Sequence, residues 1–137
     1  MKGNTKPRAL ITGITGMVGS HLADFLLENT DWEIFGMCRW RSPLDNVSHL
    51  LDRVNRKDRI QLIDGDLCDT LSLQRVVEIS NPDYVFHLAA QSYPTTSFTS
   101  PIHTLDVNIL GTARLLEVLR NTKEIDPIIH VCASSEV

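Results

Sequence analysis

Three glycines at fixed spacing are the first residues of this sequence that could do chemistry. The segment Thr12–Gly19 reads Thr-Gly-Ile-Thr-Gly-Met-Val-Gly, with an apolar run before it and an amphipathic segment, 21–28, after it. Glycines at such a junction allow a tight turn, the approach of backbone to a pyrophosphate, and close packing of helix on strand. The alternative is an ordinary glycine-rich turn. We predict phosphate binding by the helix N-terminus and by Gly13, Ile14, Thr15, Gly16, Met17, Val18 and Gly19.

A basic loop follows the second predicted strand. Residues 38–43 read Cys-Arg-Trp-Arg-Ser-Pro, and no regular element explains them. Dinucleotide-binding domains that prefer NAD place an acidic residue at the end of the second strand, where it bonds the ribose 2′-hydroxyl, whereas a basic residue there accommodates a 2′-phosphate. Since the loop has no carboxylate, Arg39 favours NADP over NAD, because a guanidinium fork suits phosphate. The alternative is a solvated loop arginine.

Other polar residues stand at or near the ends of predicted strands. Asp66 either contacts a ligand or forms a turn. Asn108 lies in an apolar helical stripe, and both a local helix bond and the organisation of a site are open. His87 interrupts an apolar strand and is interpreted as a satisfied core histidine without a catalytic role. Ser134 and Glu136 follow the last strand, where a terminating serine and an exposed loop acid are the plain alternatives.

Strands and helices must alternate to position these residues. We predict strands over 8–12, 33–37, 59–63, 84–89 and 127–132, helices over 21–28, 47–54, 71–80 and 102–121, and a long polar loop over 90–101. This alternation implies an α/β, Rossmann-type doubly wound parallel sheet in the order 3-2-1-4-5. A ligand should bind at the carboxyl ends of the strands, between strands 1 and 4.

The apolar spacing of the first and last helices predicts which of their residues form an apolar face. These are Val18, Leu22, Phe25 and Leu26 in the first helix, and Leu105, Ile109, Leu116 and Leu119 in the last. Asp69 or Thr70 should cap the helix over 71–80.

The composition indicates one globular domain. The chain has 137 residues, of which 42% are hydrophobic and 22% charged, and its net charge of −4 gives no electrostatic case for nucleic acid. The three cysteines are odd in number and form no metal-ligand pair, so we expect free thiols in a reducing compartment and no metal site. Only a short apolar run follows the basic N-terminus, so we expect a cytoplasmic protein with no membrane partner.

Several motifs together resemble those of the extended short-chain dehydrogenase/reductase family, in the NAD-dependent epimerase/dehydratase superfamily. They are Thr12-Gly13-x-x-Gly16-x-x-Gly19, Asp66-Leu67 followed by Asp69, His87-Leu88-Ala89-Ala90-Gln91-Ser92 and Asn108-Ile109-Leu110-Gly111-Thr112. The resemblance implies that Asp66 and Leu67 contact the adenine, that Leu88, Ala89, Ala90, Gln91 and Ser92 lie along the cofactor, and that Asn108 organises active-site backbone and water.

Within that family, the chain is most similar to the GDP-mannose 4,6-dehydratases. The residues that carry this likeness are Ala89-Ala90-Gln91-Ser92, Ser97-Phe98, Thr104, Asp106, Gly111-Thr112 and Ser134-Ser135-Glu136. The resemblance implies a lyase that uses NADP on a nucleotide sugar, GDP-mannose, and forms a homo-oligomer at full length. Ser134 would supply the catalytic hydroxyl and Glu136 the acid/base group for water elimination.

Two features keep alternatives open. Met17-Val18 is nearer to epimerases and 4-ketosugar reductases of the superfamily than to its dehydratases. The family's Tyr-x-x-x-Lys pair is missing, because neither Tyr84 nor Tyr93 has lysine four residues later. We therefore expect residues 1–137 to be the N-terminal part of a dinucleotide-binding domain, inactive alone, with the rest of that domain and the substrate domain outside it. A non-catalytic dinucleotide sensor is the other possibility.

Overall fold

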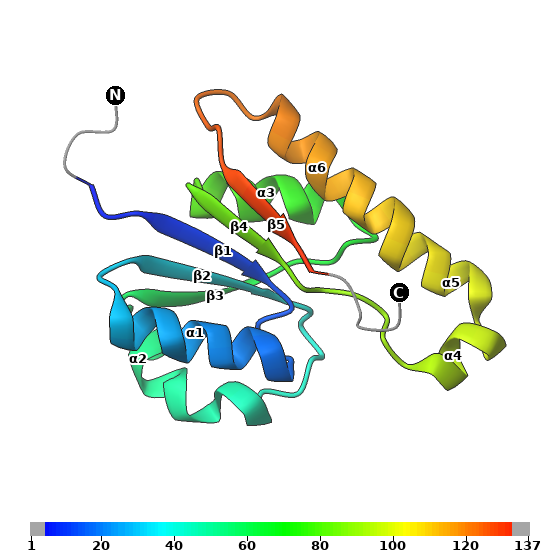
Figure 1. Cartoon of the computed structure of the whole chain (residues 1–137), viewed down its shortest axis with the longest axis horizontal. Coiled ribbons are helices and arrows are strands. Elements are labelled where there is room, and N and C mark those ends of the chain that lie inside the picture. Colours follow the sequence, from blue (N-terminus) through cyan, green and yellow to red (C-terminus); the bar gives the residue numbers. More distant parts are fainter. Residues whose placement is uncertain (1–4, 133–137) are drawn as a thin grey trace.

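A five-stranded parallel sheet forms the centre of the computed structural model, which describes residues 5–132 (Figure 1). The strand order is β3-β2-β1-β4-β5, as the alternation of elements predicts. The strands are β1 (Arg8–Thr12), β2 (Glu33–Cys38), β3 (Ile60–Asp64), β4 (Tyr84–His87) and β5 (Ile128–Val131). The chain therefore has the α/β, Rossmann-type fold expected from its sequence.

Helices cover both faces of the sheet (Figure 1). On one face lie α1 (Met17–Asn29), the 3₁₀ turn η1 (Asp45–Leu50) and α2 (Leu51–Asn55), and on the other lie α3 (Thr70–Ser80) and α6 (Gly111–Asn121). Side chains of β1 alternate between the two cores: Ala9 and Ile11 pack with α1, while Leu10 packs with α3 and α6. A strand buried on both faces explains its continuous apolar run.

Helix α1 turns a different face to the sheet from the one its apolar spacing suggests. It begins at Met17 rather than residue 21, and Val18 and Phe25 are each 59% exposed. Its buried residues are Gly19, Ser20, Ala23, Leu26 and Leu27. Small residues near its start let the helix approach β1 closely, which a stripe of large side chains at this end would prevent.

The last predicted helix is divided into three parts, and of its predicted apolar face only Leu119 packs in the core. It comprises α5 (Pro101–Leu105), a π-helical turn η2 (Asp106–Leu110) and α6, and the preceding loop contains a short helix, α4 (Pro94–Thr99). Leu105, Ile109 and Leu116 are exposed. The residues of α6 that pack on the core are Leu115, Val118 and Leu119. Apolar residues occur on two sides of this helix, so periodicity alone could not show which side meets the sheet.

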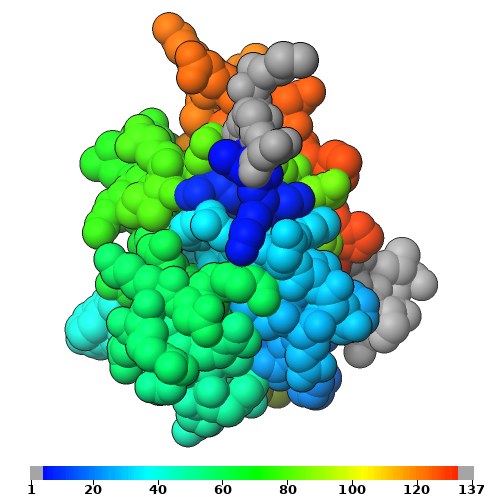
Figure 2. Space-filling model, turned by 90° about the vertical axis from the view of Figure 1, so that its left-hand side faces the viewer, coloured from blue at the N-terminus to red at the C-terminus, as the bar shows by residue number. Residues whose placement is uncertain are grey.

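Two arginines close the end of the molecule where the strands begin, the end that faces the viewer in Figure 2. Arg8 donates to the carbonyl oxygens of Ser80 (2.7 Å) and Ile79 (3.0 Å) at the end of α3. Arg59 donates to the carbonyls of Leu27, Thr30 and Trp32, at and beyond the end of α1. The bonds to Ser80, Ile79 and Leu27 satisfy carbonyl groups that a helix leaves without partners.

Candidate cofactor site

A cleft of about 500 Å³ opens at the carboxyl ends of the strands, within the size range of ligand pockets. The predicted residues that line it are Gly13, Thr15, Gly16, Arg39, Asp66, Leu67, Leu88, Ala89, Ala90, Gln91 and Ser92. Ile14, Met17, Val18 and Gly19 do not line it. Ile14 is fully buried, and the side chains of Met17 and Val18 are exposed elsewhere. The segments separated in sequence therefore meet where the sheet topology predicts.

The glycine turn is held tightly between β1, β4 and α1. Gly13 has φ +75°, which favours glycine, and a Cβ there would lie 2.9 Å from the amide nitrogen of Ala89. A Cβ on Gly19 would lie 2.8 Å from the Cα of Ile14, and closer still to the carbonyl oxygen of Gly13. Gly16 differs, because its nearest neighbour would be that same carbonyl oxygen at 3.3 Å. Gly13 and Gly19 therefore serve packing, whereas Gly16 is less tightly enclosed and lines the cleft.

The start of α1 is suited to an anion. The helix has 13 residues, its N-cap Gly16 supplies no side-chain hydrogen bond, and its first turn contains no acidic residue. Unpaired N–H groups and the positive end of the helix dipole would both attract a phosphate. The cradle at Gly16 and this uncapped helix start fit the pyrophosphate of a dinucleotide.

The loop after β2 offers one arginine to the cleft. Arg39 lines it, whereas Arg41 lies over the ring of Trp40, with 4.3 Å between the guanidinium carbon and the ring centroid. No salt bridge engages the Arg39 guanidinium within residues 5–132, so it is available to a ligand. The neighbouring Cys38 also lines the cleft, and burial, followed by the charge of Asp64, raises the pKa of its thiol. That thiol therefore adds no negative charge beside Arg39.

Asp66 forms its own turn and lines the cleft at the same time, so its two interpretations are compatible. Its Oδ1 accepts from the Cys68 amide (2.9 Å), and its backbone N–H donates to Ser72 Oγ (3.0 Å). Asp69 caps α3 as predicted, accepting from the amides of Leu71 and Ser72.

Arg114 fixes this loop from the far side, a role that the sequence did not indicate. Its Nη1 donates to the Leu67 carbonyl (3.0 Å), and its Nη2 pairs with Asp106 Oδ1 (2.5 Å). This hydrogen bond from Arg114 lowers the pKa of Asp106. Gly111 allows the close contact, since a Cβ there would lie 2.7 Å from the Cβ of Leu67. Arg114 and Leu67 are 47 positions apart in the sequence, so no local pattern could indicate that they are bonded.

Asn108 makes a bond across the cleft wall rather than a local helix bond. Its Oδ1 accepts from the Gln91 amide (2.7 Å), and its Nδ2 donates to the Gln91 carbonyl (3.0 Å). The Gln91 side chain in turn donates to Thr104 Oγ1 (3.0 Å). The loop after β4 is thus bonded to η2 and α5 at its backbone and its side chain. Ser134 and Glu136 lie outside the described residues, so their catalytic roles remain predictions.

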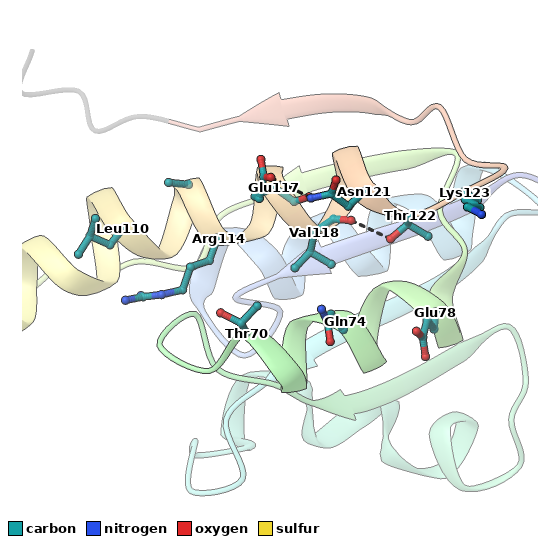
Figure 3. A pocket seen from close by; sticks show the side chains of 11 residues that line it. Thr70, Gln74, Glu78, Leu110, Arg114, Glu117, Val118, Asn121, Thr122 and Lys123 are labelled. Atoms are coloured by element: carbon teal, nitrogen blue, oxygen red, sulfur yellow. Dashed lines mark hydrogen bonds between the residues drawn. The ribbon is translucent and has the colours of Figure 1, made fainter.

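A second hollow, of about 720 Å³, lies between α3 and α6 (Figure 3). Figure 3 shows Thr70, Gln74 and Glu78 along α3 and residues of α6 across from them. Two of its charged side chains are already paired within α6 and η2, Glu117 with Arg120 and Arg114 with Asp106. None of the predicted site residues lines this hollow. The cleft at the strand ends is therefore the better candidate for a cofactor.

None of the helices within residues 5–132 has the length and hydropathy for a membrane crossing. Cys38, Cys68 and Cys132 are free thiols, as predicted.

Comparisons with known proteins agree with this fold. A GDP-mannose 4,6-dehydratase from Vibrio cholerae serotype O1 is 47% identical over 119 residues, which cover 84% of this chain and 31% of the relative. A UDP-glucose 4-epimerase from Thermus thermophilus, solved with NAD, has a TM-score of 0.67 at 29% identity, covering 82% of this chain and 33% of that one. An epimerase from Methanothermobacter thermautotrophicus has a TM-score of 0.72 at 30% identity, covering 88% and 33%.

The chain spans about a third of the length of the curated relatives it matches. The family model for GDP-mannose 4,6 dehydratase matches residues 10–137, nearly the whole chain. The chain therefore belongs to the GDP-mannose 4,6-dehydratase family.

Proposed function

We propose that this chain supplies the cofactor-binding part of an NADP-dependent nucleotide-sugar 4,6-dehydratase that acts on GDP-mannose. One observation carries the proposal: the uncapped start of α1, the glycine turn and Arg39 meet in a single cleft, in a chain of this family. Relatives at 47% and 43% identity are GDP-mannose 4,6-dehydratases. Because the chain covers only about a third of them, the activity of the whole protein belongs to this proposal.

The cleft residues divide the cofactor between them. The glycine turn and the N–H groups of α1 would hold the pyrophosphate, Arg39 the 2′-phosphate, and Asp66 and Leu67 the adenine. The loop from Leu88 to Ser92 would lie along the nicotinamide half. When bound, the cofactor supplies the redox chemistry of a reaction that oxidises C4 of the sugar, eliminates water across C5 and C6, and reduces C6. Ser134 and Glu136 are the residues proposed to act at the sugar.

The cofactor preference can be tested with Arg39→Ala. Loss of a charged hydrogen bond costs about 1.5–3 kcal/mol, so NADP affinity should fall roughly 10- to 100-fold while NAD affinity changes little. Arg41→Ala is the matched control, because Arg41 stacks on Trp40 instead of lining the cleft. Titration calorimetry with both cofactors gives the two affinities. Tighter binding of NAD than NADP by the wild type would refute the preference.

The reaction can be tested on the complete gene product with GDP-mannose and NADP. A dehydratase yields a 4-keto-6-deoxy sugar nucleotide, lighter than the substrate by one water, which mass spectrometry detects. An epimerase, the alternative that Met17-Val18 favours, yields a product of unchanged mass. Dinucleotide binding without turnover of any sugar nucleotide would support a non-catalytic sensor. Glu136→Gln should abolish the loss of water and leave cofactor binding intact, because a carboxyl group is needed for the proton transfer.

A further inference from the structure

A buried histidine joins two hydroxyl groups behind the cofactor cleft. Thr12 ends β1 and is fully buried, and His87 ends the neighbouring β4 and is 4% exposed. Thr12 Oγ1 lies 2.7 Å from His87 Nδ1, and Thr112 Oγ1 of α6 lies 2.9 Å from His87 Nε2. Both ring nitrogens are therefore used, each toward a different element.

The donors and acceptors available at Thr12 set the direction of each hydrogen bond from Thr12 through His87 to Thr112. Thr12 Oγ1 accepts from two backbone amides, those of Leu88 and Ala89, each at 3.1 Å, and the Leu88 amide is shared with the Thr12 carbonyl oxygen at 3.2 Å. A hydroxyl oxygen has two lone pairs and one proton, so the proton of Thr12 remains to be donated to Nδ1 of His87. Nδ1 must then be unprotonated.

The other ring nitrogen follows from the first. In a neutral imidazole whose Nδ1 accepts, Nε2 carries the proton and donates to Thr112 Oγ1. Thr112 then uses its own proton on the backbone carbonyl of Asn108, at 2.7 Å. The opposite direction would leave the Thr12 proton without an acceptor in a site that is fully buried.

We propose that His87 is a positioning residue of the cofactor cleft, whose neutral ring holds Thr12 and Thr112 at a fixed spacing and so fixes the glycine turn against the loop after β4. The proposal rests on the cofactor role of the cleft given above. Thr12 immediately precedes Gly13, and the amides that it accepts belong to Leu88 and Ala89, which line the cleft.

The same series of hydrogen bonds extends through Thr112 to Asn108 and the loop after β4. Asn108, whose carbonyl accepts from Thr112, bonds the backbone of Gln91 with its side chain. His87 therefore links the glycine turn, the loop after β4 and the helix over 101–121, although it does not line the cleft itself. Burial lowers the pKa of His87, which keeps the ring in the neutral form that this arrangement requires.

The first test is the tautomer of His87 in the complete gene product without ligand. Long-range ¹H–¹⁵N correlation spectra distinguish a proton on Nε2 from one on Nδ1 and from a charged ring. Near neutral pH we expect the Nε2–H tautomer. An Nδ1–H tautomer, or a charged ring, would overturn the proposal.

The second test uses two variants that each keep one of the two hydrogen bonds of His87. His87→Asn places an amide oxygen near the position of Nδ1 and can still accept from Thr12, whereas His87→Gln places an amide nitrogen near Nε2 and can still donate to Thr112. Because Thr12 is the partner next to the glycine turn, we expect NADP binding to weaken about tenfold in His87→Gln and by no more than about threefold in His87→Asn. His130→Asn is the matched control, since His130 is exposed on the adjacent strand β5.

Urea unfolding of the same variants separates positioning from general stability. If both variants lose stability equally but bind NADP like the wild type, His87 is a structural residue only and the proposal fails. If His87→Gln binds as well as His87→Asn, the role assigned to Thr12 fails. Absence of dinucleotide binding by the wild type would instead reject the proposed function, while the tautomer would still decide the hydrogen-bond assignment.

Discussion

Replacing Gly19 with alanine should strain the turn that carries the proposed phosphate site. A Cβ at this position would lie 2.8 Å from the Cα of Ile14, and the nearest atom of all is a backbone carbonyl oxygen of Gly13. Backbone atoms cannot rotate away as a flexible side chain can, so α1 must move from β1. We expect strain near the upper end of the usual range for overpacking, about 3 kcal/mol.

Part of that strain is offset, because alanine favours a helix over glycine by about 1 kcal/mol. The net loss in the free energy of unfolding is then about 2 kcal/mol. For a chain of 137 residues, an unfolding entropy of about 2.1 cal/mol/K per residue corresponds to a shift of about 3.5 °C per kcal/mol. Gly19→Ala should therefore lower Tm by about 7 °C and weaken dinucleotide binding with it.

Scanning calorimetry measures Tm and urea unfolding measures the free energy of unfolding. Gly16→Ala is the matched control for stability alone, because Gly16 itself lines the proposed phosphate site. A Cβ on Gly16 would meet its nearest neighbour at 3.3 Å, so that variant should lose less than about 1 kcal/mol, chiefly through poorer N-capping. A melting temperature for Gly19→Ala within about 2 °C of the wild type would show that α1 and β1 are not packed as closely as the structure indicates.

Three further changes test other parts of the structure. Arg59→Met should lower the free energy of unfolding by about 1.5–3 kcal/mol, because three carbonyls lose a charged donor. Arg56→Met is the control and should change that free energy by less than about 0.5 kcal/mol, since the ion pair of Arg56 is exposed; urea unfolding measures both variants. Lys57→Gly should stabilise the chain by about 0.5–1 kcal/mol, because Lys57 has φ 52°, and a thermal melt measures this. His87 should make the chain sensitive to acid: its folded pKa is lowered, so its contribution is complete above the ordinary value of 6.5 and is lost as pH falls through the folded pKa, and urea midpoints should vary less with pH in His87→Asn.

The strand order could be predicted because it depends on features that are local in sequence. Each strand is a short apolar run, each helix has its own period, and parallel crossovers leave few topologies. The position of the cleft follows from the same reasoning, since the glycine turn, Arg39 and Asp66 each come directly after a strand. The role of Asp69 as a helix cap could be predicted for the same reason, because its side chain accepts from amides only two and three residues away.

The hydrogen bonds that hold the cleft could not be predicted, because their partners are distant. Thr12 and His87 are 75 positions apart, and Arg114 is 47 positions from Leu67. Each of these residues has an ordinary local explanation, as His87 had in the sequence. Only the register of the sheet, which sets Thr12 of β1 opposite His87 of β4, shows that the imidazole ring of His87 can reach the hydroxyl group of Thr12.

The apolar face predicted for the last helix differs from the face that meets the sheet, except at Leu119, for a reason that bears on function. Far from the cleft, α6 meets the sheet with Leu115 and Val118, as hydrophobic periodicity requires. Near the cleft, the same side of the helix carries Asn108 and Gly111, which contact the backbone of Gln91 and the side chain of Leu67. Apolar side chains there would fill the space of those loops and leave their amides without partners. The polar half of this face is therefore the half that shapes the site. Asn108 is recognisable in the sequence as a polar residue in an apolar stripe, but apolar spacing alone does not indicate that its side of the helix faces the sheet.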